Sequence, residues 1–418
     1  MNNELNSFWS ANGGVINNTP VPDLSSGGGG CTQALITGLT SFQGNMTGQC
    51  VDGSAGQWPG FLKLVTPDSG NRYLTVGGFG EEVFPLMNEK GVALTQGLRL
   101  TRPFPPPPPG DFVPAGSMMR RCDSAPEYVK MWAENYMKQG APWGGRCNLV
   151  IDPKVGYCME GANFIYNDPS NHVIHGPMCD QVFASANFYI SKRLKAAAEA
   201  GIGAGYNRAR RLWQLLIDRQ YDSPTMQPRS GGITLAYFMH CLRDHGNIKP
   251  EESRLSPYIS EDRGDSALCC HGSWQYTSNA FINVSRPDHT DLFSCTWITP
   301  GQPCIAPFLP VFIGINILPK ALGTTEAFQL FEKLRAAIEY HPKHRDDITL
   351  YWSAFEIQAI EESSILEKQA SALADKGNTA EARGLLTAFV QNKCDQAMAA
   401  AENILKSVND LPVLGSSS

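Results

Sequence analysis

A cysteine that follows four consecutive glycines is the residue of this chain best placed to do chemistry. Gly27 to Gly30 leave the backbone free to take turns that other residues resist, and Cys31 then opens the first apolar run. A thiol at such a turn can attack the carbonyl just before it, which would cut the bond between Gly30 and Cys31 and leave Cys31 as a new N-terminus. The other interpretation is a flexible tail that ends at an ordinary core cysteine.

An N-terminal cysteine would carry its own base, because an α-amino group has a pKa near ~8 and can take the thiol proton. Two downstream residues could complete such a site. Asp52 ends a run that could return as a partner strand and orient the amine, although aspartate before a glycine is also common in turns. Asn171 precedes an apolar run and could donate to a developing oxyanion, although it too has the simpler interpretation of a turn residue.

The elements that must position these residues alternate between strand and helix patterns. Short apolar runs separated by turn residues predict antiparallel strands from Cys31 to about residue 100, and again at 148–151, 157–165, 172–174, 276–284, 292–299 and 307–313. Helical spacing predicts helices at 126–140, 183–200, 206–219, 233–244, 326–340, 348–373 and 379–408. Because regular strand–helix–strand alternation is missing, the pattern predicts an α+β chain with antiparallel sheet.

Several short stretches, taken in order, resemble the acyl-coenzyme A:isopenicillin-N acyltransferase-like family of N-terminal-nucleophile (Ntn) hydrolases. They begin with Gly30-Cys31-Thr32 and continue at 48–52, 89–94, 148–152, 170–172, 206–212, 242–245, 270–272, 277–282 and 299–304. Each stretch is weak alone, and the ordered series is fairly specific. Cys50 departs from the pattern, because the family often has Asn there. The part after residue 304, with 310–314 and the helical tail, resembles the related Ntn dipeptidases instead.

The resemblance implies an Ntn-hydrolase αββα four-layer sandwich with a helical C-terminal extension. It divides the chain into a leader at 1–30, a catalytic domain at 31–325 and a helical extension at 326–418 that packs on the same domain. It implies self-cleavage between Gly30 and Cys31, with Cys31 as nucleophile, Asp52 positioning its amine and Asn171 in the oxyanion hole. The family also uses an arginine near the reacting carbonyl, for which Arg99 and Arg286 are candidates. His271 lies in one of the matching stretches. It is either a candidate for substrate binding or a residue that supports packing.

The reaction implied by the resemblance is hydrolysis of a small amide or peptide, or transfer of its acyl group, through a thioester on Cys31. A dipeptidase of the related family is one alternative. A non-catalytic binding or assembly protein on the same fold, with residues 1–30 still attached, is an alternative of another class. Association with a second copy through the C-terminal helices is left open.

Composition and motifs exclude several other classes of protein. A net charge of −6 without a basic stripe argues against nucleic acid as partner, and no apolar run is long enough to span a bilayer. The first residues lack a secretory signal, which favours the cytoplasm, or the periplasm or exterior if a signal peptide has been removed. Cys269, Cys270 and His271 are of metal-ligating types, but adjacent cysteines chelate one ion poorly, so we expect no metal site and no cofactor. The triad-like Arg243-Asp244-His245 at an expected helix end is interpreted as structural.

Overall fold

Two antiparallel sheets form the centre of the computed structural model. It describes residues 31–53, 60–77, 84–99, 113–139, 145–161, 171–194, 205–222, 227–228, 232–246, 267–271, 276–339 and 341–410. The first sheet has the order β10-β1-β2-β13-β14-β15 and the second runs in chain order from β3 to β9. The predicted α+β class with antiparallel sheet is therefore confirmed.

The first sheet carries Cys31 on its second strand. Its members are β1 (Cys31–Ile36), β2 (Asn45–Gly53), β10 (Val182–Ser185), β13 (Tyr276–Ser285), β14 (Cys295–Ile298) and β15 (Leu309–Phe312). Strand β1 is buried along its whole length between β10 and β2, and Cys31 pairs with Val51. Strand β2 pairs with β1 on one side and with β13 on the other, where Val51 pairs with Asn279.

The second sheet is a meander that packs against the first. Its strands are β3 (Leu62–Val65), β4 (Tyr73–Val76), β5 (Pro85–Asn88), β6 (Ala93–Arg99), β7 (Gly145–Ile151), β8 (Gly156–Gly161) and β9 (His172–Met178). Contacts between the sheets join β1 and β2 to β6 and β7. Hydrogen bonds cross this interface: the Gln33 side chain donates to the Cys147 carbonyl at 2.9 Å, and the Gln49 side chain donates to the Gln96 carbonyl at 2.7 Å.

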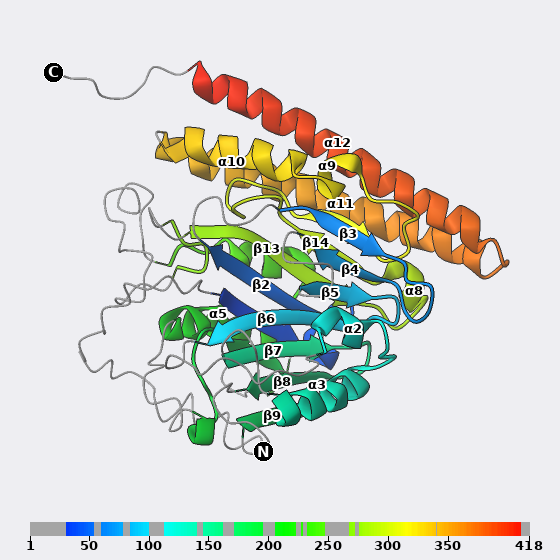
Figure 1. The fold of residues 1–418 in the computed structure, drawn as a ribbon. Helices are drawn as coiled ribbons and strands as arrows, with labels where there is room; N and C mark the ends of the chain where they lie inside the picture. Colours follow the sequence, from blue (N-terminus) through cyan, green and yellow to red (C-terminus); the bar gives the residue numbers. More distant parts are fainter. Residues whose placement is uncertain are drawn as a thin grey trace, which may run out of the picture.

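Helices cover the outer sides of both sheets (Figure 1). Helices α5 (Tyr206–Gln220) and α6 (Leu235–Leu242) contact the first sheet, where the ring of Phe238 lies against Gly48 of β2. Helices α2 (Ala115–Met119) and α3 (Ala125–Gln139) contact the second sheet. The remaining short elements are α8 (Thr290–Phe293), α9 (Lys320–Gly323), the 3-10 turns at Gly38–Thr40 and Pro342–His344, and a small ribbon of β11 (Tyr221–Asp222) and β12 (Gln227–Pro228).

Three long helices follow the last strand and lie together along one side of the molecule: α10 (Glu326–Glu339), α11 (Arg345–Ala374) and α12 (Thr379–Asn409) (Figure 1). Buried positions in α11 and α12 recur at intervals of three, four or seven residues, which gives each helix an inward stripe: Trp352, Glu356, Ala359, Ser363 and Ala370 in α11, and Ala382, Leu386, Val390, Lys393 and Ala397 in α12. Gly377, in the turn between α11 and α12, has a φ of 83°, a conformation that glycine tolerates best. Among the helices in the described part of the chain, none combines the length and apolar character needed to cross a membrane.

Two sequence-based predictions of secondary structure were wrong. The segment expected to be helical from 183 begins as β10, because pairing with β1 outweighs its local helical preference. The strand expected at 292–299 starts only at Cys295, since α8 occupies Thr290–Phe293. The three C-terminal helices were predicted correctly to within a few residues.

Candidate active site

The backbone nitrogen of Cys31 is held at the start of β1. Its N–H donates to Oδ1 of Asn187 at 2.9 Å, in the segment that leaves β10. The Cys31 side chain is 7% exposed, and Asn187 is buried. The atom that would become the α-amine after cleavage is therefore anchored in the interior. Gly30 and the bond to be cut lie outside the described residues.

Asp52 lies in β2, one residue beyond the position that pairs with Cys31. Its carboxylate is buried and accepts hydrogen bonds from the Thr277 hydroxyl at 2.7 Å, the Arg208 guanidinium at 3.0 Å and the Cys270 thiol at 4.0 Å. Thr277 pairs with Asp52 across β2 and β13, so the sheet register itself supplies this donor. The Asp52 charge is held in place from two sides.

Arg208 links Asp52 to the anchor of Cys31. Its guanidinium donates to Asp52 Oδ2 and, at 3.3 Å, to Oδ1 of Asn187. Arg208 stands in a run with Arg210 and Arg211, but its side chain is buried and the pair with Asp52 is 6% and 0% exposed. Gly205 permits this approach: its φ is 80°, and a Cβ there would lie 2.6 Å from Ala186 Cβ and 2.8 Å from the guanidinium.

The thiol of Cys31 is held in its protonated form. Burial and the nearby Asp52 charge raise its pKa to about 11, against opposing effects of the Gln49 side chain, the Asp52 backbone and Arg208. At neutral pH a thiol with that pKa is ionised in only about one molecule in 10⁴. Attack by this sulfur therefore needs a group that takes its proton.

A second arginine lies on the opposite sheet, on a strand that faces β1. Arg146 lies at the start of β7 and is partly exposed. Burial lowers the pKa of Arg146, while the charges of Tyr136 and Cys31 act in the other direction. Gln33, two residues after Cys31, donates to the carbonyl of Cys147, the residue after Arg146, so Arg146 lies on the strand that faces the start of β1.

The structure does not bring Asn171 into this cluster. The Asn171 side chain donates to the Tyr136 carbonyl at 2.7 Å, and its oxygen lies 2.7 Å from Nδ1 of His172. Arg146 in β7 pairs with Gly161 in β8, and Gly161 pairs with His172 in β9. Asn171 precedes His172, so its backbone lies two strands from Arg146, about 10 Å at ~4.8 Å per strand. Asn187, which sequence analysis did not single out, is the amide that contacts Cys31.

Neither candidate arginine is seen at Cys31: Arg286 lies far from it, and the side chain of Arg99 is outside the described part of the structure. Arg286 follows β13 at the end remote from Asn279, roughly 20 Å along the strand at ~3.3 Å per residue, and it binds the Gln43 carbonyl and Glu367, both at 2.6 Å. Arg99 ends β6 beside Gly145, and its side chain is outside the described part of the structure. Arg208 lies in a stretch that carries the family resemblance, so its position in that motif was the available signal.

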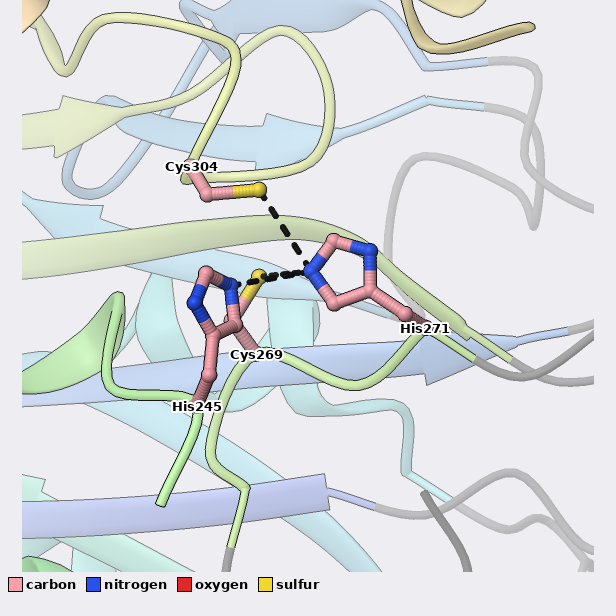
Figure 2. Close-up of side chains that lie close together, drawn as sticks. All are labelled: His245, Cys269, His271 and Cys304. Carbon is pink, nitrogen blue, oxygen red and sulfur yellow. Dashed lines mark hydrogen bonds between the residues drawn. The ribbon is translucent and has the colours of Figure 1, made fainter. Parts of the chain in front are cut away.

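His271 lies in a separate cluster with His245, Cys269 and Cys304, one residue beyond the Cys270 that borders Asp52 (Figure 2). All twelve cysteines are free thiols, and Cys50 donates to the Leu242 carbonyl at 3.3 Å. In the triad-like run, Arg243 pairs with Glu356 and Asp244 pairs with Arg211. Both contacts agree with the structural interpretation of that run.

Comparison with models of known protein families and with curated proteins finds no match for this chain.

Proposed function

We propose that this chain is a self-processing cysteine Ntn hydrolase that cleaves a small amide or peptide, or transfers its acyl group, through a thioester on Cys31. One observation carries the proposal: the Cys31 nitrogen is anchored to Asn187 at the start of a buried strand, beside the Asp52–Arg208 ion pair. Two facing antiparallel sheets with helices on both outer sides support the finer assignment to the αββα sandwich.

The first step is cleavage of the chain. The Cys31 sulfur adds to the Gly30 carbonyl carbon while Asp52, the carboxylate whose charge acts on this thiol, accepts the proton. The C–N bond then breaks, the Cys31 nitrogen takes up the proton, and a thioester joins Gly30 to the sulfur. Water hydrolyses that thioester, which releases the leader with a Gly30 carboxylate and leaves Cys31 with a free amine and a free thiol.

The new amine changes the chemistry of turnover. It has a pKa near ~8 in its ordinary state, so it can take the thiol proton at neutral pH. The thiol attacks the substrate carbonyl, the amine returns the proton to the leaving nitrogen, and water or an acceptor amine resolves the acyl-thioester. Asn187 is the candidate donor to the oxyanion, in place of Asn171, because its carboxamide lies at the nucleophile.

The two arginines have different roles: Arg208 positions other groups, and Arg146 faces the substrate. Arg208 is already engaged by Asp52 and Asn187, so it positions those groups. Arg146, partly exposed on the strand of the facing sheet that lies against β1, is the cation that a polar or anionic acyl group would meet. This favours substrates that carry such a group near the reacting carbonyl.

Intact mass of freshly purified protein tests the proposal. We expect the wild-type chain to appear as two species cut between Gly30 and Cys31, and Cys31→Ala as one uncut species. Cys179→Ala, which removes an exposed thiol, is the matched control and should be cut like the wild type. A wild-type chain that remains whole and fails to react with a thiol-directed amide analogue would favour the non-catalytic alternative.

A further inference from the structure

Four side chains of metal-ligating type converge beside the first sheet, from three places in the chain. His245 follows α6, Cys269 and His271 lie in the segment before β13, and Cys304 lies in the turn after β14. Both cysteines are buried and both histidines are partly exposed. Figure 2 shows the two imidazoles and the two sulfurs pointing toward one another.

The spacing of the four atoms fits a tetrahedral ion. All of them lie within 4.8 Å of one another, and His271 Nε2 is 3.6 Å from Cys269 Sγ and 3.5 Å from Cys304 Sγ. Around zinc, with Zn–S of about 2.3 Å and Zn–N of about 2.0–2.1 Å, neighbouring nitrogen and sulfur ligands are about 3.6 Å apart and two nitrogens about 3.3 Å. The two histidine nitrogens lie 2.9 Å apart, about 0.4 Å closer than in such a site.

Hydrogen bonding among these groups cannot satisfy them equally well. His271 Nε2 faces three polar atoms, yet a neutral imidazole nitrogen offers either one hydrogen or one lone pair. A metal ion takes one lone pair from each of the four atoms, so it would satisfy all of them at once.

The backbone around the cluster is fixed by other contacts. The N–H groups of Leu268 and Cys269 donate to the Asp244 carbonyl at 2.8 and 3.1 Å, which joins the two segments that carry His245 and Cys269. The Thr349 hydroxyl of α11 donates to the Cys304 carbonyl at 2.6 Å. These contacts fix the backbone beside His245, Cys269 and Cys304 independently of the cluster.

We propose that His245, Cys269, His271 and Cys304 form a structural zinc site. Two thiolates and two imidazoles are soft and borderline ligands that suit Zn²⁺, and four protein ligands leave no open position for a substrate. The site is therefore distinct from the chemistry at Cys31, and the proposal holds whether or not the chain is an enzyme.

The zinc would brace one wall of the Cys31 site. Cys270 lies between two of the ligands, its N–H donates to the Thr277 hydroxyl at 2.8 Å, and that hydroxyl donates to Asp52. The Gln302 side chain donates to the Cys270 carbonyl at 2.7 Å, two residues before the fourth ligand. An ion bound to both sides of Cys270 would fix the donor that orients the Asp52 carboxylate.

Metal analysis of the full-length chain tests the site. We expect about one zinc per purified chain, the stoichiometry of a single four-ligand site, and loss of at least nine-tenths of it in Cys304→Ala and in His245→Ala. Cys295→Ala, which removes a buried thiol of β14 outside the cluster, should keep its zinc.

A second measurement guards against variants that fail to fold. Wild-type protein stripped of metal by a chelator is titrated with Co²⁺ alone, and we expect thiolate-to-cobalt charge-transfer absorption that saturates at one equivalent and is displaced by Zn²⁺. The proposal would be overturned if purified protein held no stoichiometric metal and the cobalt-titrated protein showed no thiolate-to-cobalt bands. A disulfide between Cys269 and Cys304 in protein purified without oxidant would also overturn it.

Discussion

Replacing Asp52 with asparagine separates the structural role of this carboxylate from its chemical role. The side chain keeps its shape and its oxygen can still accept from Thr277, but the charge opposite Arg208 is lost. Because that pair is 6% and 0% exposed, Arg208 is left as a buried cation with no counter-charge from Asp52. Removing one partner of a buried ion pair costs about 3–5 kcal/mol in the free energy of unfolding.

The matched control is Asp291→Asn, which breaks a pair with Arg383 of similar length, 2.9 Å, in which Asp291 is 48% exposed. Such pairs contribute about 0–1 kcal/mol. Denaturant unfolding of both variants, each made with Cys31→Ala so that every chain stays whole, should therefore differ by at least about 2 kcal/mol. The double change of Asp52→Asn and Arg208→Gln should recover most of the lost stability, since it removes both charges.

The chemical role is tested by the rate of leader cleavage against pH. In the wild type we expect a weak dependence between pH 7 and 9, because Asp52 takes the proton of a thiol whose pKa is about 11. Asp52→Asn should cleave at least about 10²-fold more slowly at pH 7, and its rate should rise about tenfold per pH unit because only the free thiolate can attack. The stability-rescued double variant should stay slow. Cleavage by Asp52→Asn at the wild-type rate, with the wild-type pH profile, would refute the assignment.

Two further substitutions test the surrounding framework. Glu356→Gln should lower the free energy of unfolding by about 3–5 kcal/mol, because it leaves Arg243 as a buried cation. The fraction of folded chains that is cleaved should stay at the wild-type level. Urea titration and intact mass measure the two quantities, and an unchanged free energy of unfolding would contradict the prediction. Gly205→Ala should lower the free energy of unfolding by about 1–3 kcal/mol and slow cleavage, because the added methyl strains a φ of 80° and pushes on Arg208. The control is Gly384→Ala in α12, where open space surrounds the added methyl, and it should be neutral or stabilising by up to ~1 kcal/mol. Equal effects of the two substitutions would argue against the role given to Gly205.

Local pattern was sufficient for most of the elements of this fold. The C-terminal helices repeat apolar residues over many turns, and their expected bounds differ from α10, α11 and α12 by only a few residues. The segment after 182 could not be predicted in the same way, because its strand exists only through pairing with β1. Pairing partners that are about 150 residues apart leave little trace in the local pattern.

The candidate site was predictable only in part. The position of Asp52 follows from the return of β2 along β1, which sequence reasoning anticipated. Asn187 and Arg208 come from segments more than 150 residues away, and a helical arginine in a basic run has the same local signature whether it faces solvent or a buried carboxylate. The four-residue cluster was missed for a related reason: the expectation of no metal site assumed ligands close in sequence, whereas only Cys269 and His271 are.

The raised pKa of Cys31 is better suited to an uncut chain than to a working enzyme. With an amide nitrogen at Cys31 there is no amine to receive the thiol proton, and the Asp52 charge adds to burial in disfavouring the thiolate. The proposed cleavage would create a cation-forming amine at the atom that Asn187 now holds, within the same network as Asp52. A positive charge there would offset Asp52 and lower the pKa of the thiol. The same buried carboxylate would therefore disfavour a free thiolate before cleavage, when it must itself accept the thiol proton, and would orient the new amine afterwards.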